Sequence, residues 1–125
     1  MPKTDAEWRA LDERLAREVM GWHKHLFWWS LDESGCPVSV HLIPDWQPHK
    51  NVAQAIEVAD MLIDQHPDMR YTLQRDPRLY WCFFHFSPEW STVRYVGFEC
   101  TLAEAICLAA EQWANAQKEV QDDPG

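Results

Sequence analysis

The most apolar stretch of the chain is Leu79–Phe86, read LYWCFFHF, in which every residue is aromatic, aliphatic, Cys or His. A strand with one face in water would alternate apolar and polar residues. An unbroken apolar run between turns is typical of a strand buried on both faces. Asp76-Pro77 precedes this run and Ser87-Pro88 follows it. We therefore expect it to be the central strand of a sheet that is covered on both sides.

Three segments carry apolar residues at the spacing of amphipathic helices, namely 4–20, 51–66 and the stretch that opens at Thr101. Thr4 with Glu7, and Thr101 with Glu104, have the spacing of capping boxes and so predict where the first and last helices begin. Pro67 should end the second helix. The polar residues 121–125 are expected to form a frayed tail.

Four further segments, 25–31, 38–43, 69–74 and 93–99, have the composition or alternation of strands. Turn residues at 32–35 predict that the first two form a hairpin, and Gly97 predicts a bulge in the last. The order is then α-β-β-α-β-β-β-α. It favours an α+β fold in which about five strands form one largely antiparallel sheet within a three-layer α/β/α sandwich. We expect residues 1–125 to be a single domain.

Charge and cysteine content narrow the function further. The chain has 11 Lys and Arg against 20 Asp and Glu, a net charge of −9, which argues against direct binding to nucleic acid. No apolar run approaches the roughly 20 residues that span a bilayer, and the polar start is unlike a signal peptide. The four cysteines form no C-x-x-C pair. We therefore expect reduced thiols and a cytoplasmic protein.

Motifs for catalysis, metals or phosphate-binding loops are absent from the sequence. We expect no enzyme activity, no metal and no cofactor. Cys100, just before a helix start, and His85, within the apolar run, are the most reactive candidates, and for both we favour a structural role. One local basic group could receive an anionic ligand or could pair with surplus carboxylates. Its members are Arg70, Arg75, Arg78 and Arg94.

Candidate binding residues fall into two groups. Trp28, Trp46 and Trp90 occupy strand or loop positions, which is typical both of interface anchors and of residues at the edge of a core. Both interpretations stay open. The second group, Glu57, Asp60 and Asp64, lies off the apolar stripe of the second helix and contributes to the acidic surface.

Three segments in order resemble the phage ABA sandwich family of small phage and prophage proteins: 19–22 (VMGW), 48–58 (PHKNVAQAIEV) and 105–110 (AICLAA). The second is similar to the family's P-S-T-D-I-A-x-A-W-E-V stretch and the third to its A-I-C-L-A-A. The resemblance implies an α/β/α sandwich and no known activity, catalytic residue or cofactor. The sequence departs from the family at His49-Lys50-Asn51, in place of S-T-D, and at Ile56, where Trp is frequent.

Together these features favour a non-enzymatic phage accessory protein that binds a host or phage protein. The sharpest version is an inhibitor of host antiviral defence, like an anti-CRISPR protein, whose acidic surface blocks a basic nucleic-acid-binding channel. The alternatives are a binder that sequesters a small anionic ligand such as a nucleotide signal, and a phage assembly accessory. An unpaired edge strand could also support a homodimer.

Overall fold

The computed structural model describes residues 3–25, 28–31, 39–86, 93–99 and 101–122, and shows the predicted α+β class. Its helices are α1 (Asp5–Glu18), α2 (Val52–Gln65), α3 (Leu102–Asp122) and the short 3-10 helix η1 (Ile43–Asp45). Its strands are β1 (His23–Lys24), β2 (Trp28–Ser30), β3 (Ser39–Leu42), β4 (Met69–Arg75), β5 (Tyr80–Phe86) and β6 (Val93–Glu99). Because α3 extends to Asp122, the first two residues of the expected frayed tail are helical.

The helices begin where the sequence predicts. The Glu7 amide donates to Thr4 Oγ1 at 3.2 Å and the Thr4 amide donates to Glu7 Oε1 at 3.3 Å, which completes the capping box of α1. The Glu104 amide likewise donates to Thr101 Oγ1 at 3.2 Å. Asn51 caps α2 by accepting from the Gln54 amide at 3.2 Å. These side chains satisfy amide groups that have no partner within the first helical turn.

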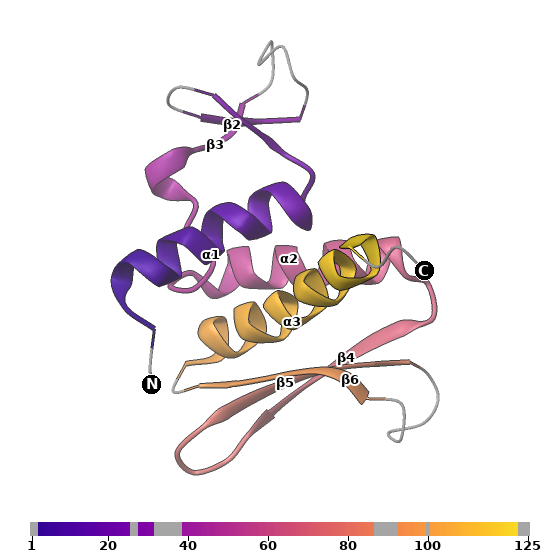
Figure 1. Ribbon diagram of the computed structural model, residues 1–125. Coiled ribbons are helices and arrows are strands. Elements are labelled where there is room, and N and C mark those ends of the chain that lie inside the picture. Colours follow the sequence, from indigo (N-terminus) through magenta and orange to yellow (C-terminus); the bar gives the residue numbers. More distant parts are fainter. Residues whose placement is uncertain (1–2, 26–27, 32–38, 87–92, 100, 123–125) are drawn as a thin grey trace.

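The strands form two antiparallel three-stranded sheets, ordered β1-β2-β3 and β4-β5-β6, in place of the single sheet of about five strands that we expected. The predicted hairpin is confirmed, since β2 pairs with β3. Strand β5 is central in its sheet, as predicted. Figure 1 shows the three helices on one side of β4–β6, with the β1–β3 sheet beyond α1.

Only one face of β5 is fully buried, so the prediction of burial on both faces was wrong. Cys82 and Phe84 point into the core, whereas Trp81, Phe83 and His85 are half-buried on the opposite face. The Trp81 and Phe83 rings stack there, with centroids 5.8 Å apart, and His85 Nε2 lies 3.0 Å from Thr72 Oγ1. Large neighbouring rings shield one another, so this open face needs few polar residues.

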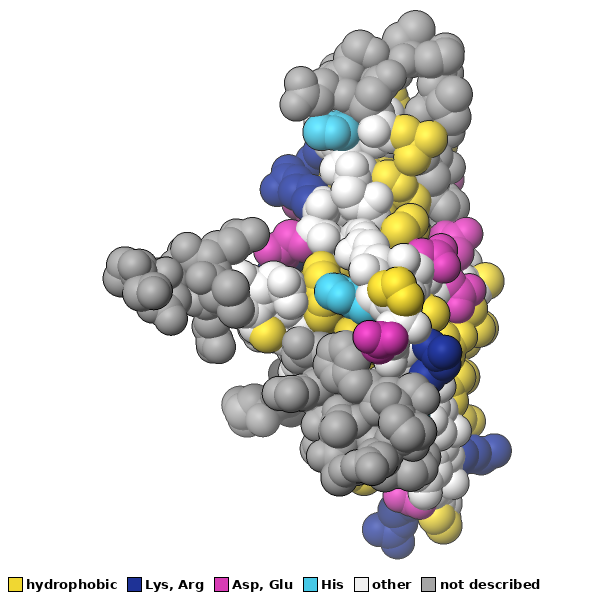
Figure 2. Space-filling model, turned by 90° about the vertical axis from the view of Figure 1, so that its right-hand side faces the viewer, with side chains coloured by type: hydrophobic (Ala, Val, Ile, Leu, Met, Phe, Trp, Pro, Cys, Tyr) yellow, Lys and Arg dark blue, Asp and Glu magenta, His cyan; other side chains and the backbone are white. Residues whose placement is uncertain are grey.

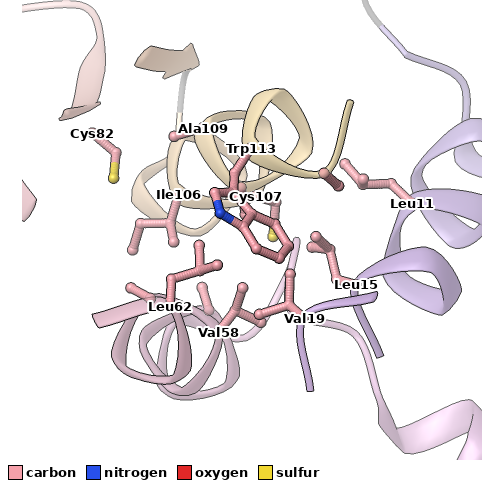
Figure 3. Close-up of a cluster of buried hydrophobic side chains, with 14 of the residues drawn as sticks. Leu11, Leu15, Val19, Val58, Leu62, Cys82, Ile106, Cys107, Ala109 and Trp113 are labelled. Carbon is pink, nitrogen blue, oxygen red and sulfur yellow. The ribbon is translucent and has the colours of Figure 1, made fainter. Parts of the chain in front are cut away.

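The core lies where the three helices meet the inner face of β5 (Figure 3). Leu15 of α1, Leu62 of α2 and Ile106 of α3 are fully buried there. Small residues on α3, Ala105 and Ala109 among them, let that helix approach the sheet closely. The core is therefore assembled around α3, which contacts both other helices and the sheet.

Gly97 lets α3 lie directly against β6. A Cβ atom at this position would overlap the Ala105 carbonyl oxygen and lie 2.5 Å from the Ala109 amide nitrogen. The predicted bulge at Gly97 was wrong, because Gly97 pairs in register with Cys82 and the irregularity falls between Phe84 and His85. This glycine therefore serves helix–sheet packing.

We expect Gly97→Ala to lower the free energy of unfolding by about 1–3 kcal/mol, because the added methyl group must displace the backbone of α3. Urea denaturation would measure the loss. Gln74→Ala, at an exposed position of β4 in the same sheet, should change the same quantity by less than about 0.5 kcal/mol. Equal stability of Gly97→Ala and the native chain would contradict this account of α3 packing.

Candidate functional site

The three predicted acidic residues of the second helix share one exposed face of α2. Glu57, Asp60 and Asp64 are spaced i, i+3 and i+7, opposite the buried stripe that contains Val58 and Leu62. We call these three residues the acidic face of α2. Figure 2 shows acidic side chains in magenta at mid-height of the molecule, the level at which Figure 1 places the helices.

The charges of α2 oppose the usual preference of a helix. A helix favours anions near its N-terminus and cations near its C-terminus. Here the first turn carries no acidic residue, the last turn contains Asp64 and no basic residue, and Lys50 stands just before the helix. Asp64 therefore opposes the dipole of its own helix.

Asp60 is held by a tyrosine on the neighbouring strand. The Tyr71 hydroxyl of β4 donates to Asp60 Oδ1 at 3.1 Å. Burial of Tyr71, together with the negative charge of Asp60, raises the pKa of the Tyr71 phenol. The phenol accordingly remains a donor at neutral pH and restrains one carboxylate of the acidic face.

The predicted tryptophans do not join this face. Trp46 is only 3% exposed: its Nε1 donates to the Asp12 carbonyl at 2.8 Å, and its ring meets Trp22 edge-on at 4.6 Å. Trp46 thus fits the core-edge interpretation. Trp28 is half-buried on β2 and stacks on His25, whereas Trp90 lies outside the described residues.

The arginine group is not gathered into one site. Arg70 and Arg75 lie near opposite ends of β4, about 17 Å apart along an extended strand. Arg70 donates to the carbonyls of Pro67 and Met69, both at 2.8 Å. Arg75 lies over the Tyr80 ring at 5.3 Å. The side chain of Arg94 is outside the described part of the structure.

A buried pair of polar residues, Asp12 and His49, was missed by the sequence analysis. His49 Nδ1 lies 2.6 Å from Asp12 Oδ2, and the His49 amide donates to Asp12 Oδ1 at 3.4 Å. The His49 ring stacks on Trp8, with centroids 5.3 Å apart. Asp12 lies on α1 and His49 precedes α2, 37 residues away along the chain. The position of Asp12 beside the apolar stripe was the available signal.

Burial has the largest effect on the pKa of Asp12. Asp12 is 3% exposed, and its loss of hydration raises its pKa to about 6, although the attraction of His49 and, to a smaller extent, of Lys50 opposes the rise. Burial also raises the pKa of Cys82 to about 12, so this thiol stays protonated. Among the described residues, no three His, Cys, Asp or Glu side chains gather in a way that could hold a metal.

Comparison with known proteins gives one result. The chain matches the Phage ABA sandwich domain family over residues 13–110, most of its length. It therefore belongs to this family of phage protein domains. No curated protein matches it, and no solved structure does. None of the described helices is both long and apolar enough to cross a membrane.

Replacement of Asp12 should change how stability depends on pH. Because its pKa is higher in the folded chain than in the unfolded one, the native protein binds the extra proton between about pH 4 and 6 and loses stability as pH rises through that range. We expect the stability of the native chain relative to Asp12→Asn to fall by up to about 3 kcal/mol between those pH values.

Urea denaturation of both proteins at pH 4.5 and 7 would measure this difference. Asp60→Asn, which removes a carboxylate from an exposed position, is the control for the loss of one negative charge. A pH-independent difference between the native chain and Asp12→Asn would show that the folded Asp12 carboxyl titrates as it does in the unfolded chain.

Proposed function

We propose that the protein is a non-enzymatic phage or prophage protein that inhibits host antiviral defence by binding a host effector in the cytoplasm. In this proposal it acts as an anti-CRISPR-like blocker, and its acidic surface occupies a basic channel that otherwise binds nucleic acid. The observation that carries the proposal is the acidic face of α2, three exposed carboxylates on a helix that contains no Lys or Arg.

The spacing of these carboxylates suits such a partner. Seven residues of helix separate Glu57 from Asp64, so the three charges follow one another at about 5 Å along the helix axis. Phosphates along one strand of duplex DNA are about 3.4 Å apart when the distance is measured along the duplex axis. A row of lysines and arginines that follows a nucleic-acid backbone would therefore meet charges of the same sign at a similar interval.

The placement of the charges supports a role in recognition. An acidic residue in the last turn of a helix lowers stability by about 0.3–1 kcal/mol, and no local ion pair with a basic residue of α2 can offset it. The net charge of −9 also favours rapid association with a basic partner. Arg70 and Arg75 lie near opposite ends of β4, so these two described residues do not support the alternative in which the arginine group sequesters a small anion.

A phage-plating assay tests the proposal. The protein would be expressed in bacteria that carry active CRISPR–Cas systems of several types, each challenged with a phage that the system targets. We expect restored plaques with at least one system, and displacement of nucleic acid from its purified effector. The variant Glu57→Gln/Asp60→Asn/Asp64→Asn should need about tenfold more protein for displacement, since three exposed ion pairs contribute about 0.2–1 kcal/mol each.

The control variant carries the same change in net charge at other places. Glu18→Gln/Asp45→Asn/Asp76→Asn alters three exposed residues that lie outside α2 and should displace nucleic acid as well as the native chain. Equal potency of the α2 variant and the native protein would exclude the acidic face of α2 as the binding surface. If plaques were restored with none of the systems, that result would count against an anti-CRISPR role.

A further inference from the structure

The first turns of all three long helices meet at one hollow in the surface. Figure 1 shows α1, α2 and α3 running side by side, with their starts on the same side of the molecule. The hollow has a volume of about 860 Å³, within the usual range for sites that bind small molecules. It is lined by residues that include Trp8 of α1, Val52 of α2, Leu102 of α3 and Tyr80 of β5. We call it the N-terminal hollow.

His49 is the polar group that distinguishes this hollow. The residue is 6% exposed and lines the hollow, while Asp12 holds its Nδ1 from behind and Trp8 stacks on its ring. None of the described residues forms a hydrogen bond with His49 Nε2. Nε2 keeps some access to the hollow, since it is not one of the fully enclosed side-chain nitrogens. Since the ring is fixed on two sides, Nε2 is a positioned contact for a ligand in the hollow.

Lys50 is the cation beside His49 that can meet an anion. The hollow is lined by two lysines, Lys3 and Lys50, and by two acidic residues, Asp5 and Glu104, and Lys3 forms an ion pair with Glu111 at 3.1 Å. Of the two acidic lining residues, Glu104 accepts from Thr101 Oγ1 at 2.6 Å within the cap of α3. Lys50 forms no ion pair with any residue that the structure describes. The adjacent helix N-termini add partial positive charge.

We propose that the N-terminal hollow binds a small organic phosphate, with the phosphate at His49 and Lys50 and an apolar or aromatic body against Tyr80, Val52 and Leu102. Phosphate suits His49 in either protonation form. A doubly protonated ring donates from Nε2 to a phosphate oxygen, and a neutral ring held by Asp12 accepts from a P–OH group. A carboxylate could satisfy only the first arrangement, so the hollow fits a phosphate monoester such as a nucleotide better.

This site is separate from the acidic face of α2. Lys50 precedes the start of α2, whereas the acidic face begins at Glu57, the sixth residue of the helix, and points away from its start toward Asp64 in the last turn. The two surfaces can therefore be tested independently, and loss of one function would leave the other measurable.

Calorimetric titration of the full chain with AMP, adenosine and inorganic phosphate tests the proposal. We expect AMP to bind and to raise the melting temperature, and adenosine and inorganic phosphate to bind at least tenfold more weakly, because each lacks one half of the ligand. Lys50→Gln, at an exposed position, should weaken AMP binding about tenfold, the effect of losing one charged hydrogen bond.

Two further variants complete the test. Arg70→Gln removes the same charge from an exposed residue at the far end of β4 and should bind AMP as the native chain does. His49→Gln should abolish binding if its circular dichroism spectrum remains native. If it unfolds, Lys50→Gln alone decides the outcome. The proposal is overturned if AMP does not bind at millimolar concentration, if adenosine or phosphate alone binds equally well, or if Lys50→Gln and Arg70→Gln bind alike.

Discussion

The close contact of α3 with β6 at Gly97 is the constraint on which the rest of the structure depends. Because no side chain separates them, the alanines of α3 lie against the sheet, and Ile106 and Trp113 fill the space toward the other helices. Helices α1 and α2 pack on the remaining faces of α3 (Figure 3). The sheet β4–β6 thus receives its only described helical cover on one face, and the small sheet lies beyond α1 (Figure 1).

The same arrangement separates partial positive and partial negative charge across the molecule, which the net charge alone does not reveal. All three long helices run the same way, so their partially positive starts gather on one side and their partially negative ends on the other. Lys3, His49 and Lys50 lie at the starts, and Asp64 lies at an end. The side chains at the two ends of α2 therefore reinforce its dipole instead of compensating it, and Lys50 lies at the positive end.

Most of the fold could be predicted because its signals are local. The capping sequences predicted the starts of α1 and α3, and the local sequence pattern predicted that β2 pairs with β3. The wrong predictions concern features that depend on contacts between residues far apart in the sequence or on how side chains pack. Stacking of Trp81 on Phe83 made a half-open strand look fully apolar, and the role of Gly97 depended on a helix that follows it. The acidic face of α2 followed from helical periodicity, whereas the Asp12–His49 contact joins two segments that carry no common pattern.

Stability does not account for the two features that we connect with function. Burying Asp12 beside His49 removes both groups from water, and an apolar pair of similar size is often at least as stable. The charges of α2 likewise oppose its dipole. Natural chains keep such departures from local rules mainly at sites where another requirement outweighs stability. The aromatic strand β5 breaks no such rule, because its inner face fills the core and its outer rings cover one another. The most apolar segment therefore explains how the chain folds, while the polar residues on and before α2 are those for which we propose a binding role.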